Sequence, residues 1–99
     1  MKILIVCAAG MSSSLIVEKM NKAARKRGLE ISIDANAIDV FQDIVHKYDI
    51  VLLGPQVGYQ KERCKKLAAQ NNISLGIIDA IDYGMLNGSS ILDYGLSLL

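Results

Sequence analysis

The sequence has little of what several large protein classes require. Aromatic residues make up 5% of its 99 residues, with no tryptophan, and there is a single proline and a single histidine. Its two cysteines lie far apart, at positions 7 and 64, so neither a disulfide framework nor a zinc-ligand pattern is expected. No apolar run approaches the roughly 20 residues of a membrane-spanning helix. We therefore expect no metal and no direct membrane insertion, in a reducing, cytoplasmic environment.

Charge excludes another class. Eleven lysines and arginines balance ten acidic residues, which leaves a formal net charge of +1, and no long basic run is present. A nucleic-acid partner is not expected, because such proteins concentrate positive charge on one surface. With 52% apolar residues and 99 positions, the chain suits one compact domain spanning residues 1–99.

The apolar residues alternate between two periods along the chain. Short β-branched and aliphatic runs, typical of strands buried on both faces, alternate with longer segments of helical spacing. A capping-box-like start at residues 39–42 predicts the second helix. The strands are expected at 3–6, 30–35, 50–53 and 75–78, and the helices at 12–27, 39–48, 59–71 and 89–99.

This alternation predicts an α/β fold: a single, doubly wound, four-stranded parallel sheet in the order 2-1-3-4, with helices on both faces. Open sheets of this kind bind ligands at the carboxyl ends of the strands, beside the point where the strand order reverses. The loops after Val6 and Leu53 should therefore face each other and form the site.

Cys7 stands where the first predicted strand passes into a loop of small and hydroxyl residues. Amides of such a loop, with the start of the following helix, can cradle an anion and favour the nucleophilic thiolate. A buried structural cysteine is the alternative. The functional interpretation requires a reachable sulfur with the loop amides turned toward it. The predicted phosphate-binding loop is Ala8, Ala9, Gly10, Met11, Ser12, Ser13 and Ser14.

Low-molecular-weight tyrosine phosphatases share this fold and also use a cysteine beneath a phosphate-binding loop. They need an arginine six positions after that cysteine, where this chain has Ser13, and an aspartate before a proline, where it has Gly54 before Pro55. A loop that holds a phosphoryl group without hydrolysing it suits a carrier. A phosphatase-like hydrolase and a non-catalytic regulatory domain remain the alternatives.

Three segments resemble one family, the enzyme IIB subunits of the bacterial phosphoenolpyruvate-dependent sugar phosphotransferase system, in the lactose, cellobiose and chitobiose class. They are residues 7–15 (CAAGMSSSL), residues 51–57 (VLLGPQV) with Tyr59, and residues 78–79 and 83–84. The resemblance covers nearly the whole chain.

The resemblance implies that residues 1–99 are a phosphocarrier domain. A phosphohistidine of enzyme IIA would donate a phosphoryl group to Cys7, and the phosphocysteine would donate it to a sugar held by the membrane-embedded enzyme IIC. No cofactor is implied beyond this covalent intermediate. The chain would work in the cytoplasm, at the inner face of the membrane through enzyme IIC.

Four further residues follow the third and fourth predicted strands, on the same edge as Cys7. Gln56 and Tyr59 can equally be ordinary turn and helix-start residues. For Asp79 and Tyr83 a direct role at the site is less expected. These candidate rim residues are Gln56, Tyr59, Asp79 and Tyr83.

Overall fold

The computed structural model describes residues 1–8 and 10–99, with the side chains of residues 10–13 left out of the description. Four parallel strands form one sheet in the order β2-β1-β3-β4, which confirms the predicted fold class and strand order. The strands are β1 (Lys2–Cys7), β2 (Ser32–Ala37), β3 (Ile50–Leu53) and β4 (Ser74–Ile77).

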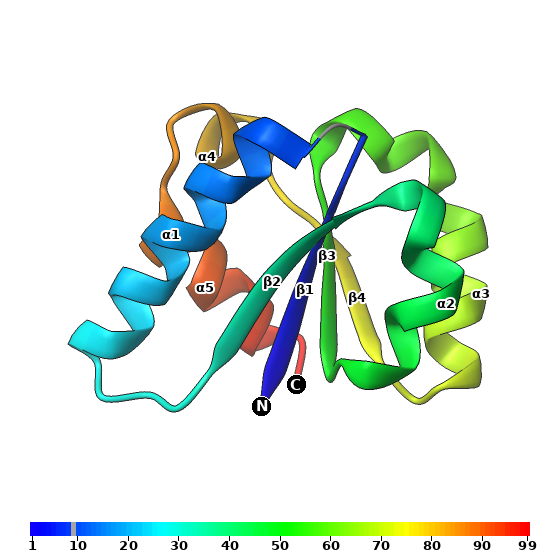
Figure 1. The fold of residues 1–99 in the computed structure, drawn as a ribbon, viewed down its shortest axis with the longest axis horizontal. Helices are drawn as coiled ribbons and strands as arrows, with labels where there is room; N and C mark the ends of the chain where they lie inside the picture. The colour runs from blue at the N-terminus through cyan, green and yellow to red at the C-terminus, as the bar shows by residue number, and fades with distance from the viewer. Residues whose placement is uncertain (9) are drawn as a thin grey trace.

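Helices cover both faces of the sheet (Figure 1). On one face lie α1 (Gly10–Lys26) and α5 (Gly88–Ser97), and on the other lie α2 (Phe41–Ile44) and α3 (Lys61–Gln70). The short α4 (Ala80–Gly84) follows β4.

Period-two alternation in β1 and β3 supplies both halves of the core. Ile3 and Ile5 pack with residues of α1 and α5, whereas Leu4 and Val6 pack with residues of α2 and α3. All four side chains are fully buried, and each contributes about 1.5–3 kcal/mol of burial free energy. The continuous apolar run in β1 therefore fixes the sheet between two helical layers.

The carboxyl ends of β1 and β3 lie side by side. Val6 is in register with Leu53, and the Gly54 amide donates to the Val6 carbonyl at 2.8 Å. This confirms that the loops after these strands share one edge of the sheet.

The predicted helix at 39–48 is wrong in its details. The segment forms a 3₁₀ turn η1 (Ile38–Val40), then α2, then a second 3₁₀ turn η2 (Val45–Lys47), and no side chain caps any of the three. The reason is that β2 continues to Ala37, two residues beyond its predicted end. Asp39 consequently lies inside η1, where it cannot act as an N-cap.

Other predicted boundaries shift by one or two residues, and two further differences concern the elements themselves. The segment after β3 begins as a 3₁₀ helix η3 (Pro55–Gln60), and the α-helical part starts only at Lys61. The pattern also gave no sign of α4, because five residues are too few to show helical periodicity.

Candidate functional site

Cys7 is the last residue of β1, at the edge of the sheet where β1 and β3 end (Figure 1). It pairs in register with Ala37, the last residue of β2. The alternation that turns Ile3 and Ile5 toward α1 and α5 places the Cys7 side chain on the same face. Since α1 begins at Gly10, Cys7 stands directly before the amino end of the longest helix.

The Cys7 thiol is closed off from solvent. The residue is 1% exposed, and Sγ donates a hydrogen bond of 3.6 Å to the Asn36 carbonyl of β2. The expectation of a reachable sulfur is therefore not met. Its position explains this, because the last residue of β1 pairs with β2 and lies on the face covered by α1. Any reaction at Sγ requires local opening.

Only part of the predicted phosphate-binding loop is described. Ala8 and Ser14 are exposed, the latter within α1. Ala9 lies outside the described residues, as do the side chains of Met11, Ser12 and Ser13, and of Gly10 only the place in α1 is described. The helix begins at Gly10, two residues before its predicted start, so Ser12, Ser13 and Ser14 lie within its first turns.

Gly54 brings two of the predicted rim residues together at the end of β3. A Cβ at this position would lie 2.9 Å from Gln56 Oε1, 3.2 Å from the Val6 carbonyl oxygen and 3.4 Å from Tyr83 Cε2. Gln56 is exposed and Tyr83 is buried. The absence of a side chain at Gly54 leaves room for both to approach the backbone of Gly54, which is hydrogen-bonded to Val6, the residue before Cys7.

The other two rim residues have different surroundings. Asp79 is the N-cap of α4, and its carboxylate accepts hydrogen bonds from the amides of Ile81 (3.1 Å) and Asp82 (3.2 Å). Tyr59 is 78% exposed on η3. Asp79 thus positions α4, and Tyr59 is available to a partner.

A hollow beside β2 was not predicted from the sequence. It has a volume of about 370 Å³, and its walls come from α1, from β2 and from Tyr48. Tyr48 donates a hydrogen bond of 3.0 Å to Asp34 Oδ2, and Asn36, whose carbonyl accepts from Cys7, lies in the same wall. The sequence analysis missed Asn36, because this residue lies beyond the predicted end of the second strand and the pairing of distant strands leaves no local signal.

Comparison with known proteins identifies the family. Residues 2–94 match the family model described as PTS system, Lactose/Cellobiose specific IIB subunit. The oligo-beta-mannoside-specific EIIB component of Bacillus subtilis is 41% identical over 98 residues, which cover 99% of this chain and 95% of the relative. The chain belongs to this IIB family.

Further relatives agree with this assignment. The galactose-specific EIIB component of Lactococcus lactis is 38% identical over 95 residues, with 91% of this chain and 88% of the relative covered. A lactose-specific EIICB component of Lacticaseibacillus casei is 30% identical over 94 residues, which are 93% of this chain and 16% of that longer protein.

Solved IIB structures share the fold. The cellobiose-specific IIB component of Borrelia burgdorferi has a TM-score of 0.81 at 36% identity, covering 99% of this chain and 90% of that one. The lactose-specific IIB domain of Streptococcus pneumoniae has a TM-score of 0.89 at 24% identity, covering 98% and 95%.

The remaining titratable candidates of this IIB chain lie away from Cys7. Cys64 is fully buried in the core between the sheet and α3, and burial raises the pKa of its thiol against the lowering effect of the Arg63 charge. His46 is exposed in η2, just before β3 begins.

Within residues 1–8 and 10–99, no three His, Cys, Asp or Glu side chains cluster as a metal site. No helix in the described part of the chain is long and apolar enough to cross a bilayer.

The Tyr48–Asp34 contact makes the stability of the IIB chain sensitive to alkaline pH. Burial, then the hydrogen bond and the negative charge of Asp34, raise the pKa of Tyr48 above its ordinary value of 10.0. Its contribution to stability is thus complete below pH 10 and is lost as the pH rises through the folded-state pKa. Replacing Tyr48 by phenylalanine should cost about 1 kcal/mol at neutral pH and flatten this alkaline decline, measured by urea unfolding at several pH values. An unchanged decline in Tyr48→Phe would assign it to another group.

Proposed function

We propose that Cys7 carries a phosphoryl group between a phosphohistidine of enzyme IIA and a sugar bound by membrane-embedded enzyme IIC. The supporting observation is the position of Cys7, at the carboxyl end of β1 beside β3 and directly before α1, in a chain of the IIB family. Ligands of open α/β sheets bind at this place.

The reaction has two displacements. The Cys7 sulfur attacks the phosphorus of the phosphohistidine, the N–P bond breaks as the S–P bond forms, and the imidazole leaves with the proton that the thiol gives up. A sugar hydroxyl then attacks the same phosphorus, the S–P bond breaks, and the hydroxyl proton is released as the thiolate departs. Catalysis of this kind consists mainly of in-line positioning and charge stabilisation.

The amino end of α1 is well placed to stabilise the phosphoryl group on sulfur. The first amides of a helix lack intrahelical acceptors, and the helix dipole adds partial positive charge there. Because α1 begins at Gly10, these amides follow Cys7 closely along the chain. The hydroxyls of Ser12, Ser13 and Ser14 would add neutral hydrogen-bond donors. A carrier needs no group that activates water to hydrolyse the phosphocysteine.

The closed thiol sets a condition on this reaction. Sγ must leave its hydrogen bond to Asn36 before it can reach a phosphorus atom. A thiol is a weak donor, so exchanging this bond costs little. Opening is therefore expected when a partner docks at this edge.

Exposed apolar side chains surround the edge where partners would meet Cys7. Tyr59 on η3 is 78% exposed, Ile81 on α4 is 70% exposed, and Met85 at the end of α4 is 75% exposed. All three follow the carboxyl end of a strand. Exposed apolar residues gathered around a reactive group are typical of a docking surface. The EIICB relative supports enzyme IIC as one partner.

Replacing Met85 by aspartate should weaken this docking while leaving the chemistry intact. We expect KM for phosphorylated enzyme IIA or for enzyme IIC to rise about tenfold, with kcat nearly unchanged, because the charge opposes apolar contact. Leu99→Asp is the matched control, since Leu99 is 66% exposed and lies beyond the carboxyl end of α5. Equal effects of the two substitutions would place the docking surface elsewhere.

Reconstitution tests the proposed function. Phosphorylated enzyme IIA is mixed with this chain and with vesicles that contain enzyme IIC and a cellobiose-like or lactose-like sugar. We expect the phosphoryl group to pass to the chain and then to the sugar, and sugar phosphate should not form when the chain is left out. Release of inorganic phosphate in place of sugar phosphate would favour a hydrolase.

A further inference from the structure

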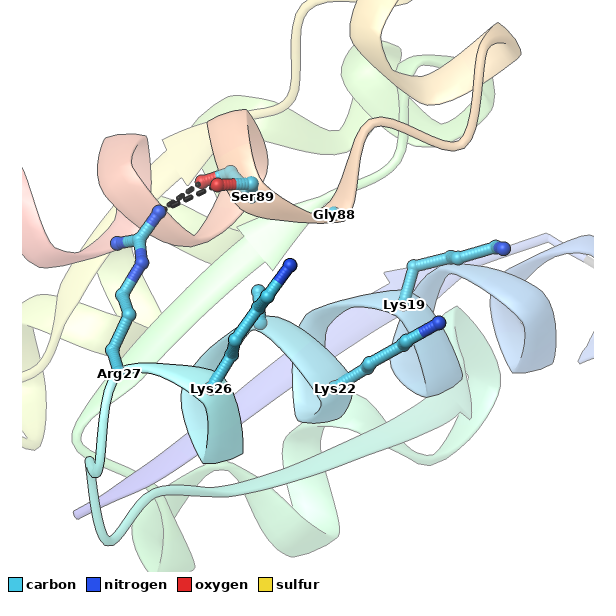
Figure 2. Close-up of a pocket in the computed structure, with 7 residues that line it drawn as sticks. Lys19, Lys22, Lys26, Arg27, Gly88 and Ser89 are labelled. Atoms are coloured by element: carbon cyan, nitrogen blue, oxygen red, sulfur yellow. Dashed lines mark hydrogen bonds between the residues drawn. The ribbon is translucent and has the colours of Figure 1, made fainter.

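A basic groove separates α1 from the start of α5, away from Cys7 (Figure 2). Its volume is about 270 Å³. The name basic groove is used below for its seven lining residues: Lys19, Lys22, Ala23, Lys26, Arg27, Gly88 and Ser89.

Most of the positive charge in the basic groove is uncompensated. Arg27 is occupied, because its guanidinium forms an ion pair with Asp93 and donates to Ser89 Oγ at 2.6 Å. In the part of the chain that the structure describes, no carboxylate forms a salt bridge with Lys19, Lys22 or Lys26. All three lysines are exposed, so three free ammonium groups remain for a ligand.

The lysines form a row. Residues at positions i, i+3 and i+7 share one helix face, and seven residues of helix span about 10 Å. Figure 2 shows the ammonium groups of Lys19, Lys22 and Lys26 spread along the basic groove, with no common point of convergence. One phosphate ion cannot contact all of them in this arrangement. The spacing fits a ligand with several separated negative charges.

Small residues keep the basic groove open beneath these lysines. Gly88 packs directly on α1, and a Cβ there would lie 2.5 Å from the Lys19 carbonyl carbon. Ala23 adds another short side chain. In addition, the side chain of Asn87 donates to Asp82 and makes no cap hydrogen bond to α5, whose first residues line the hollow at the positive end of the helix dipole.

The basic groove does not overlap the Cys7 edge. α1 starts near the carboxyl end of β1 and leads away from that end, and the three lysines lie on the second half of α1 (Figure 1). A ligand here would leave the edge of the sheet at Cys7 free for its partners. The basic groove is therefore a second surface, and its occupation is independent of the function proposed for Cys7.

We propose that the basic groove binds an acidic segment of a protein partner, with glutamates or aspartates spaced along the lysine row. A recessed channel suits a polypeptide segment better than the plane of a membrane surface. The overall net charge of +1 and the 64% exposed Asp93 side chain beside the basic groove oppose a nucleic-acid backbone, whose negative charge continues past three lysines.

Anisotropy titration of fluorescein-labelled deca-glutamate with the full chain tests this proposal. The variant Lys22→Glu/Lys26→Glu should weaken binding at least tenfold. The matched control Lys61→Glu/Lys65→Glu alters an equally spaced, exposed pair near the start of α3 and lowers the net charge by the same amount. It should weaken binding less than twofold. Thermal unfolding of both variants verifies that they fold.

Amide chemical shifts provide the second measurement, which maps the peptide without any phosphoryl transfer. We expect shifts at residues 19–27 and 88–89, with none around Cys7. Equal weakening by the two double variants, or shifts spread over the whole surface, would show non-specific attraction and overturn the proposal. Tighter, groove-dependent binding of inorganic phosphate, oligothymidylate or anionic lipid vesicles than of deca-glutamate would also overturn it.

Discussion

Replacing Cys7 by alanine is expected to abolish phosphoryl uptake, with a loss of at least about a thousandfold in transfer from phosphorylated enzyme IIA to sugar. The loss is large because the account gives the nucleophile no substitute. Cys7→Ala should still fold, since it removes one buried sulfur at the end of a strand, at a cost of about 1 kcal/mol.

Cys64→Ala is the matched control for this prediction. Cys64 is also fully buried, but it packs between α3 and the sheet. The same substitution there should lower stability by about 1 kcal/mol and leave transfer nearly unchanged. Coupled sugar phosphorylation and urea unfolding measure both effects. Retained transfer in Cys7→Ala, or equal losses in both variants, would remove Cys7 from the reaction.

The largest effect on stability is expected from Gly88→Ala. A methyl group there would meet backbone atoms of α1, the Lys19 carbonyl carbon at 2.5 Å and the Met20 nitrogen at 2.7 Å. Because backbone cannot rotate away as a side chain can, α5 must move off α1. We expect a loss of about 2–3 kcal/mol in the free energy of unfolding, or roughly 10–20 °C in Tm.

Gly84→Ala provides the comparison. Gly84 lies in α4, and no heavy atom lies within 4 Å of a Cβ at this position. Alanine there should be neutral or stabilising by up to about 1 kcal/mol, since it reduces the entropy of the unfolded chain. Calorimetry of the two variants checks the pair. Similar Tm values would show that α1 and α5 separate readily.

The sequence predicted the architecture well because the informative pattern is long and repeated. β1 and β3 contain continuous runs of buried aliphatic residues, and the crossover rules leave few possible topologies. Predictions failed where the sequence pattern is short, or where pairing within the sheet overrides a local helix signal. β2 extends to Ala37 because it pairs with Cys7, a contact far apart in the sequence, and this displaced the predicted cap at Asp39.

The site was predicted only in part, for a similar reason. The position of Cys7 follows from strand and helix order alone. Its burial and its hydrogen bond to Asn36 depend on how β2 lies beside β1, which no local pattern records. The approach of Gln56 and Tyr83 at Gly54 likewise depends on the end of β3 and on α4.

The central claim is that the phosphoryl group resides on the sulfur of Cys7. Its most direct test is mass spectrometry of tryptic peptides after phosphorylation by enzyme IIA, combined with ³¹P NMR of the intact chain. Residues 3–19 form one peptide, which contains Cys7 together with Ser12, Ser13 and Ser14. The account predicts one phosphoryl group on this peptide, at Cys7, with a phosphorus shift typical of a thiophosphate ester. A phosphoserine in this peptide, or a phosphoryl group on any other peptide, would contradict it.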